Sequence, residues 1–312
     1  MSSPQGPASG LPVRMPRPRQ PGRHRRPEPV AAPEGAPSLV LAVPGTPSAA
    51  TRMLADEVVS IARSELPGLD ARVAFVEGEV TDFPVSAEFP SLASVLAHAA
   101  KERGSRYEQA LAAGVEGVKE PEGPVAVVVP LLAGPDNAQV RQIHQGIADS
   151  RVAAELTDVL GPHPLLAEGL HVRLSEAGLA RADRARLFTV ATAADGIILV
   201  TVGGEEAVQA AGITGMLLAA RLAVPVMAAA LDAEGAVTAI AEQLRGSGSQ
   251  QLALSPYLIG PELDPSVLEA AAKDAGCAAA EPLGAYPAMG KLALAKYTAA
   301  LGITPQPVAS GG

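Results

Sequence analysis

Three carboxylates stand at predicted helix starts in the second half of the chain. Glu205 and Glu206 follow a Gly203-Gly204 turn, and Asp264 precedes a proline. Carboxylate oxygens bind divalent metal ions and accept protons. A local role competes with this chemistry, because Asp264 is a good N-cap before a proline and acidic residues are favoured in a first helical turn. If Glu205 and Asp264 converge across their two loops, they would form a hard oxygen site.

Other kinds of site receive less support. No two histidines have the i, i+4 or short-loop spacing of metal ligands. His171 falls in the middle of a predicted helix, and we expect it to be partly exposed. Gly203-Gly204 could cradle a phosphate, but it lacks the third glycine of a dinucleotide fingerprint and the Lys-Ser/Thr of a P-loop. No G-x-S-x-G nucleophile elbow is present.

Buried strands must position these residues. Residues 125–135 read V-A-V-V-V-P-L-L-A-G-P, a short apolar run that ends in a Gly-Pro breaker. Such a run is typical of a strand buried on both faces of a parallel sheet. Asp136 and Asn137 follow as good helix N-caps. Residues 251–261, Q-L-A-L-S-P-Y-L-I-G-P, repeat the same pattern.

A second marker recurs in the same order. L-G-P-H-P at 160–164 opens one predicted helix, and L-G-A-Y-P at 283–287 opens another. Each half alternates four predicted strands with four helices, which indicates α/β domains with parallel sheets. The predicted organisation is a Pro/Arg-rich disordered tail (1–37), a first domain (38–178), a linker (179–195), a second domain (196–302) and a flexible tail (303–312).

Two such domains would enclose a cleft at the carboxyl ends of their strands, where open α/β sheets bind ligands. Four loops should line it, namely 44–48, 132–137, 203–206 and 258–264. Within or beside these loops we expect eight residues to contact a substrate: Pro44, Gly45, Thr46, Gly134, Asn137, Gly203, Gly204 and Tyr257.

Composition narrows the partners. Of 312 residues, only 3% are aromatic and none is Trp, which argues against base-stacking platforms for nucleic acid. The net charge is −9 although residues 1–37 carry six arginines, so the remaining chain is strongly acidic and would repel phosphates. Cys277 is the single cysteine, which fits a reducing, cytoplasmic location. The longest apolar stretch, 215–231, contains an arginine and a proline and predicts a buried helix followed by a strand rather than a membrane span.

Over roughly residues 38–302 the chain resembles the small class II metallochelatases, in particular the sirohydrochlorin cobalto- and ferrochelatases. The resemblance depends on V-V-V-P-L-L-A-G-P, on S-P-Y-L-I-G-P, and on L-G-P-H-P-L-L-A and L-G-A-Y-P-A-M-G. It implies two flavodoxin-like halves around a tetrapyrrole cleft. It also implies insertion of Co(II) or Fe(II) as substrate into sirohydrochlorin, in cobalamin or siroheme biosynthesis, with no permanently bound cofactor.

The chain departs from this family where the family carries metal-binding histidines. Pro44 stands at the histidine position of the first loop, and Ala138 stands eight residues after the strand-end Pro130. In the second half the corresponding residue after Pro256 is Asp264, a carboxylate. Two hypotheses follow: a chelatase in which Asp264 and Glu205 are the catalytic and metal-binding residues, or a catalytically silent relative that binds a tetrapyrrole, a metal or a partner protein.

Overall fold

A computed structural model describes residues 31–33, 35–115, 117–180, 193–260, 262 and 264–303. Nearly all of the two predicted tails and the middle of the predicted linker lie outside these ranges. The first half of the fold consists, in chain order, of β1 (Ser38–Val43), α1 (Ala49–Glu65), β2 (Ala71–Phe75), α2 (Leu92–Ala112), β3 (Ala126–Pro130), α3 (Asn137–Ser150), β4 (Ala154–Leu156) and α4 (Pro164–Glu176).

The second half repeats this alternation. It consists of β5 (Gly196–Thr201), α5 (Gly204–Leu222), β6 (Val226–Ala230), α6 (Ala236–Gly246), β7 (Leu252–Pro256), α7 (Pro265–Asp274), β8 (Ala278–Ala279) and α8 (Pro287–Ala300). The apolar stretch 215–231 thus forms the end of α5 and all of β6, as predicted. None of the helices in the described part of the chain is long and apolar enough to cross a membrane.

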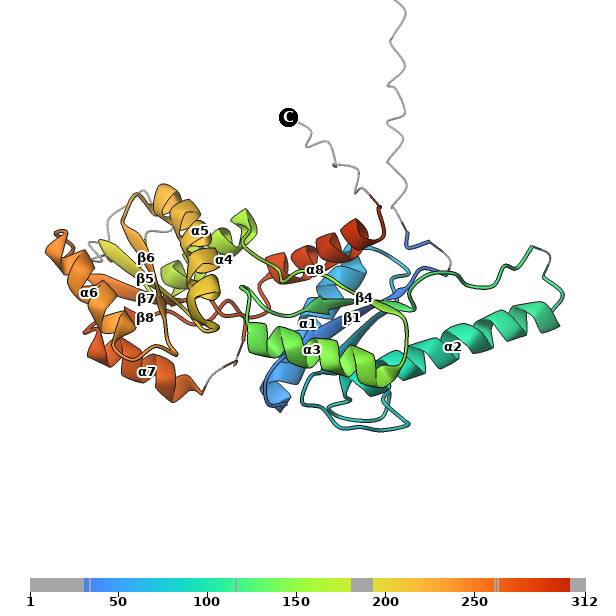
Figure 1. Ribbon diagram of the computed structural model, residues 1–312. Coiled ribbons are helices and arrows are strands. Elements are labelled where there is room, and N and C mark those ends of the chain that lie inside the picture. Colours follow the sequence, from blue (N-terminus) through green and yellow to red (C-terminus); the bar gives the residue numbers. More distant parts are fainter. Residues whose placement is uncertain are drawn as a thin grey trace, which may run out of the picture.

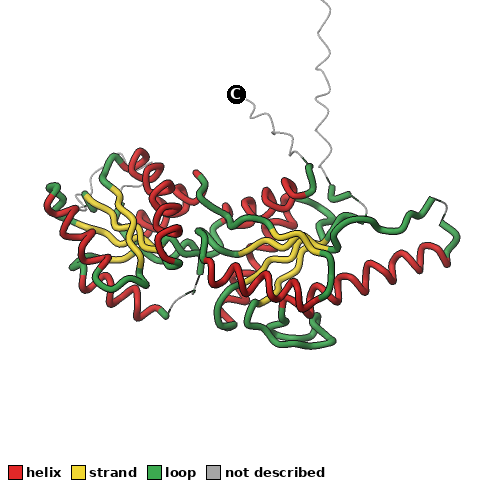
Figure 2. The backbone as a smooth tube through the Cα atoms, viewed as in Figure 1, coloured by secondary structure: helices red, strands yellow, loops and turns green. Residues whose placement is uncertain are grey.

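The two sheets have the same topology. The first has strand order β2-β1-β3-β4 and the second β6-β5-β7-β8, and every pairing is parallel. Every residue of the central strands β1, β3, β5 and β7 is buried, because helices cover both faces of each sheet (Figure 2). This confirms the predicted fold class, two tandem four-stranded α/β units that face each other.

The last helix of each half packs on the opposite half. Helix α8 lies against α1 and β3 of the first half, and α4 lies against α5 and β7 of the second (Figure 1). A Cβ at Gly290 of α8 would lie 2.5 Å from Ile61 Cγ2 of α1, so the two helices approach each other closely. The buried Tyr297 of α8 also donates a hydrogen bond to the carbonyl of Pro37 at 2.7 Å. The repeated helix-entry motifs therefore stand where the chain crosses between halves.

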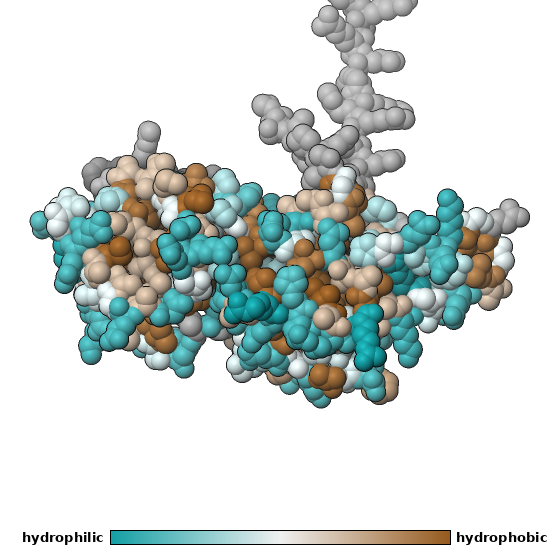
Figure 3. Space-filling view, viewed as in Figure 1, coloured by the Kyte–Doolittle hydropathy of each residue, from teal (hydrophilic) through white to brown (hydrophobic). Residues whose placement is uncertain are grey.

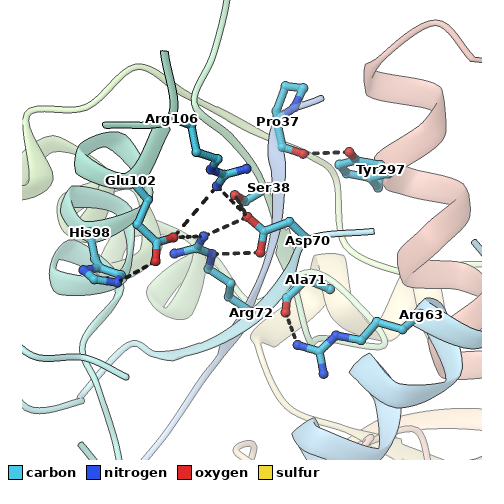
Figure 4. Close-up of polar contacts among 10 residues, drawn as sticks. All are labelled: Pro37, Ser38, Arg63, Asp70, Ala71, Arg72, His98, Glu102, Arg106 and Tyr297. Carbon is cyan, nitrogen blue, oxygen red and sulfur yellow. Dashed lines mark hydrogen bonds and ion pairs between the residues drawn. The ribbon is translucent and has the colours of Figure 1, made fainter. Parts of the chain in front are cut away.

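An ionic network holds the amino ends of β1 and β2 to α2 (Figure 4). Arg72 pairs with Asp70 at 2.8 Å and with Glu102 at 2.5 Å, and Ser38 donates a hydrogen bond to Asp70 at 2.7 Å. Burial by itself would raise the pKa of Asp70, but the hydrogen bonds with Arg72 and Ser38 and the charge of Arg106 bring that pKa below its ordinary value. The network lies at the opposite edge of the sheet from the predicted cleft.

The surface is polar along much of the lower margin in the view of Figure 3, and apolar residues form patches across its middle. Some large apolar side chains are well exposed, among them Phe83 in the loop after β2 and Met216 on α5. Val80 and Val85 are exposed on either side of Phe83 in the chain, and Ile213 and Leu217 are exposed on either side of Met216.

Candidate functional site

A cavity of about 510 Å³ lies between the two halves, at the carboxyl ends of their strands. All four loops that were expected to line a cleft contribute to it. We call this cavity the cleft; it is lined by Pro44, Gly45, Leu132, Ala133, Gly134, Asp136, Asn137, Ala138, Gln139, Thr201, Val202, Gly203, Gly204, Asp232, Tyr257, Leu258 and Glu262. Its size falls within the range of small-molecule sites.

Glycines allow the two halves to meet closely around the cleft. Gly203 has φ +108°, and a Cβ there would lie 2.7 Å from the carbonyl oxygen of Pro135 in the other half. A Cβ at Gly134 would lie 3.0 Å from the ring of Tyr257, again across the two halves. Side chains at these positions would push the strand-end loops apart.

Asp136 and Asn137, in the segment after β3, make different polar contacts. Asp136 is the N-cap of α3 and accepts hydrogen bonds from the backbone N–H groups of Ala138 (2.9 Å) and Gln139 (3.1 Å). Asn137 Nδ2 donates to Glu206 Oε2 of the second half at 3.1 Å. Asp136 thus caps α3 as predicted, whereas Asn137 is the first residue of that helix and joins the two halves through Glu206.

Asp232 is a cleft carboxylate that sequence reasoning missed. It follows β6, and its Oδ2 accepts a hydrogen bond from the backbone N–H of Gly203 at 3.2 Å. The sequence could have indicated Asp232 by its position just after a predicted strand of the second sheet, because loops at the carboxyl ends of parallel strands meet at one edge of the sheet.

Glu262 is the second cleft residue that sequence reasoning missed. It is half-buried, and its two carboxylate oxygens accept hydrogen bonds from the backbone N–H groups of Ile259 (2.8 Å) and Gly260 (3.0 Å). Burial raises the pKa of Glu262 to about 7, although the backbone hydrogen bonds act in the opposite direction. It lies in the loop 258–264, which was predicted to line the cleft, but Asp264 was the carboxylate predicted to act there.

Tyr257 forms part of the wall of the cleft. Its side chain is 1% exposed, and its hydroxyl accepts a hydrogen bond from Thr214 of α5 at 3.2 Å. Burial raises the pKa of this phenol to about 12, so it remains protonated at neutral pH. Tyr257 therefore contributes to the shape of the cleft wall rather than to proton transfer.

The two carboxylates predicted to bind metal lie outside the lining of the cleft. Asp264 is exposed and caps α7 by accepting the N–H of Ser266 at 2.9 Å, and this hydrogen bonding lowers its pKa. Glu205 lines a different cavity beside α5 and α6, and Asp264 lines neither. Their role in binding metal stays a prediction.

The other predicted residues are mostly found at the cleft. Pro44, Gly45, Gly134, Asn137, Gly203, Gly204 and Tyr257 all line it. Thr46 does not, and its hydroxyl donates instead to Glu77 at 3.2 Å. Ala138, at the position of a family histidine, lines the cleft with only a methyl group.

The described histidines lie away from the cleft. The expectation that His171 is partly exposed was wrong: it is 4% exposed, and its Nδ1 accepts a hydrogen bond from Arg221 Nε at 2.7 Å, because α4 packs on α5. Within the described ranges, no three His, Cys, Asp or Glu side chains are grouped so that they could hold a metal ion together.

No protein-family model matches the chain, and no curated protein matches it. Two solved structures share its fold. SirB from Bacillus subtilis, whose structure contains Fe3+, aligns with a TM-score of 0.55 at 13% identity over 83% of this chain and 94% of SirB. DR2241 from Deinococcus radiodurans, a multi-domain protein with structural similarity to chelatases, aligns with a TM-score of 0.51 at 16% identity over 83% of this chain.

The chain spans about half of the Deinococcus protein, since the alignment covers 55% of that protein. At these identities the likeness concerns the fold alone. The chain has a chelatase-like fold, with its cleft between the two halves.

Proposed function

We propose that the chain inserts Co(II) or Fe(II), as substrate, into a sirohydrochlorin-like tetrapyrrole held in the cleft. The observation that carries this proposal is the 510 Å³ cleft between two equivalent sheets, with Asp136, Asp232 and Glu262 in its lining. The chelatase-like fold adds support. We further propose a cytoplasmic location and no permanently bound cofactor.

The lining suits the chemistry of metal insertion. Three carboxylates in one cleft attract a divalent cation from solution. Carboxylate ligands hold such an ion less firmly than an imidazole set, so the ion can be passed on to ring nitrogens. Asp264 and Glu205 remain proposed metal-binding or proton-accepting residues outside this lining. Gly203 and Gly204 line the cleft without side chains.

An absorbance assay tests the proposal. Purified protein, sirohydrochlorin and Co(II) or Fe(II) are mixed without oxygen, and the spectrum of the metallated product is followed against the protein-free rate. We expect acceleration that saturates with sirohydrochlorin. Equal rates with and without protein at every metal concentration would reject catalysis and leave the silent relative that binds a tetrapyrrole, a metal or a partner.

A matched variant shows whether any acceleration comes from the cleft. Asp232→Asn removes one cleft charge, while Glu234→Gln removes the same charge from a neighbouring exposed residue that does not line the cleft. We expect the first change to raise the metal concentration needed for half-maximal rate and the second to leave it unaltered. The same shift in both variants would place metal capture elsewhere.

A further inference from the structure

The loop between β2 and α2, residues 77–90, holds large apolar side chains out to solvent. It runs along the lower margin of the first half in Figure 1. Val80, Phe83 and Val85 are each at least 75% exposed. Exposed apolar side chains that gather in one short stretch mark interaction surfaces, whereas isolated ones do not. We call this stretch the apolar loop.

Hydrogen bonds fix the conformation of the apolar loop. The backbone N–H of Glu79 donates to the carbonyl of Phe89 at 2.7 Å, and the N–H of Ser91 donates to the carbonyl of Glu79 at 2.8 Å. The N–H of Thr81 donates to the Ser94 hydroxyl of α2 at 2.9 Å. The loop is thus braced against itself and against α2 while its apolar side chains face solvent.

The apolar loop is also acidic, and one segment of the chain has the opposite charge. The loop carries no Lys or Arg but four exposed carboxylates, those of Glu77, Glu79, Asp82 and Glu88. Residues 11–26, the basic segment, hold six arginines and no acidic residue, with Leu11, Val13 and Met15 among the first arginines. Guanidinium groups pair with carboxylates and stack on aromatic faces such as the ring of Phe83. The two stretches are therefore complementary in charge and in apolar content.

The basic segment is connected to the first half at a point from which it can reach the apolar loop. The N–H of Ala32 donates to the carbonyl of Pro67, just beyond the end of α1, at 3.0 Å. The loop lies near the other end of α1, where Arg52 donates to the carbonyl of Glu88 at 2.6 Å. Because α1 has 17 residues, the two points are about 25 Å apart. The chain from Arg19 to Ala32 can span about 40 Å when extended, which covers this distance.

A second exposed apolar surface, on α5, suits the basic segment less well. Ile213, Met216 and Leu217 are exposed there, but residues 207–220 of this helix include no charged residue. Arginines gain no charge pairing from such a face. Helix α5 also belongs to the second half, whereas Ala32 is bonded to the first. The surface on α5 therefore provides a control.

We propose that the basic segment docks on the apolar loop of the same molecule and covers Val80, Phe83 and Val85. Its arginines lie against the loop carboxylates and the ring of Phe83. The contact is intramolecular, so its occupancy does not depend on protein concentration. The full chain thereby covers a surface that would otherwise be open to other molecules. This inference is independent of the proposed function.

A single introduced tryptophan can report on the contact, because the chain contains no Trp. Phe83→Trp places the reporter in the apolar loop, and Met216→Trp, at a position 66% exposed on α5, is the matched control. Both are made in the full chain. Each is made again in a full chain that also carries Arg14→Gln, Arg17→Gln, Arg19→Gln, Arg23→Gln, Arg25→Gln and Arg26→Gln. Quenching of the tryptophan fluorescence by acrylamide, which is uncharged, is measured over a range of protein concentrations.

We expect acrylamide to quench the Phe83→Trp reporter about twofold less when the arginines are present, because a docked guanidinium covers one face of the indole. The difference should be independent of protein concentration and should disappear in about 1 M NaCl, where the Debye length is about 3 Å. Neutralising the loop with Glu79→Gln, Asp82→Asn and Glu88→Gln should remove the protection as the arginine substitutions do. The Met216→Trp reporter should be quenched equally in both chains.

Three results would overturn the proposal. The first is equal quenching of the Phe83→Trp reporter with and without the arginines. The second is protection that increases with protein concentration, which would assign the contact to a second copy of the chain. The third is equal protection of the Met216→Trp reporter, which would show an effect of segment charge without a docking site. If Phe83→Trp prevents folding, Val85→Trp in the same loop is measured by the same criteria.

Discussion

The loops after β3 and β7 begin alike and end differently. Both leave a buried strand through a proline, and both carry an acidic residue six positions later, Asp136 in the first half and Glu262 in the second. Helix α3 begins seven residues after its proline, whereas α7 begins nine residues after its own. Asp136 is therefore used as the cap of α3, while Asp264 caps α7 and leaves Glu262 available to turn back towards the cleft.

This difference shows how two halves with the same topology present different side chains to one cleft. Equivalent positions have equivalent backbone surroundings, but a shift of two residues in a helix start changes which carboxylate is needed as a cap. The side chain that is not needed can face the ligand. In this chain the second half supplies Asp232, Glu262 and Tyr257 to the cleft, and the first half supplies Asp136, Asn137 and Gln139.

The amino ends of the two sheets differ as well. In the first half, charged side chains pair with one another around Arg72. In the second half, the partly exposed Asp195 accepts the backbone N–H groups of Gln250 (2.9 Å) and Gln251 (2.8 Å), which lowers its pKa. The first arrangement depends on a specific cation, and the second depends only on the backbone.

The largest expected effect comes from a substitution that disrupts the contact between the halves. Gly203→Val introduces a β-branched residue at φ +108° with its Cβ 2.7 Å from the carbonyl of Pro135. We expect the free energy of unfolding to fall by about 3 kcal/mol, measured by urea denaturation. Gly212→Ala, in the middle of α5 with open space around its Cβ, should be neutral or stabilising by up to about 1 kcal/mol. Equal stability of Gly203→Val and wild type would mean that the halves do not meet as described.

The next largest effect concerns the ionic network at the amino end of the first sheet. Arg72→Met leaves the partly buried Asp70 without its main partner, and we expect a loss of about 2 kcal/mol at pH 7. The pKa of Asp70 is lower in the folded protein than its ordinary 3.8, so its contribution is present above that value and is lost as the pH falls through the folded pKa. The difference from wild type should narrow below pH 4.

Urea denaturation at pH 7 and pH 3 measures this change. Arg141→Met, at an exposed position on α3, is the control and should alter stability by no more than about 0.5 kcal/mol. A difference between Arg72→Met and wild type that is constant with pH would show that packing of the arginine, rather than its charge pair, is what stabilises this edge.

The smallest expected effect comes from a substitution that adds a metal-binding side chain to the first half. Ala138 lines the cleft at the position where Asp264 stands in the second half. Ala138→His adds an imidazole, which binds Co(II) and Fe(II) well, and we expect insertion to become about tenfold faster, roughly 1.4 kcal/mol in activation free energy. Ala138→Gln adds similar bulk and should not accelerate insertion. Equal rates in the two variants would place the metal path away from α3.

The sequence alone determined the duplicated α/β architecture. Short apolar runs ended by Gly-Pro predict strands buried on both faces, and Asp136 and Asp264 predict helix starts, because both signals are carried by residues close together in the chain. The loops of the cleft followed, since parallel strands place their carboxyl ends together. Seven of the eight predicted contact residues line that cleft.

Only the tertiary structure decided which side chains reach the cleft. Asp232 and Glu262 line it, while Glu205 and Asp264 do not, because these directions depend on backbone N–H groups in folded loops and on packing by the other half. Local sequence patterns also do not show that α4 and α8 each pack on the opposite half. A largely apolar helix must pack against a sheet, but its sequence does not show which of two similar sheets it covers.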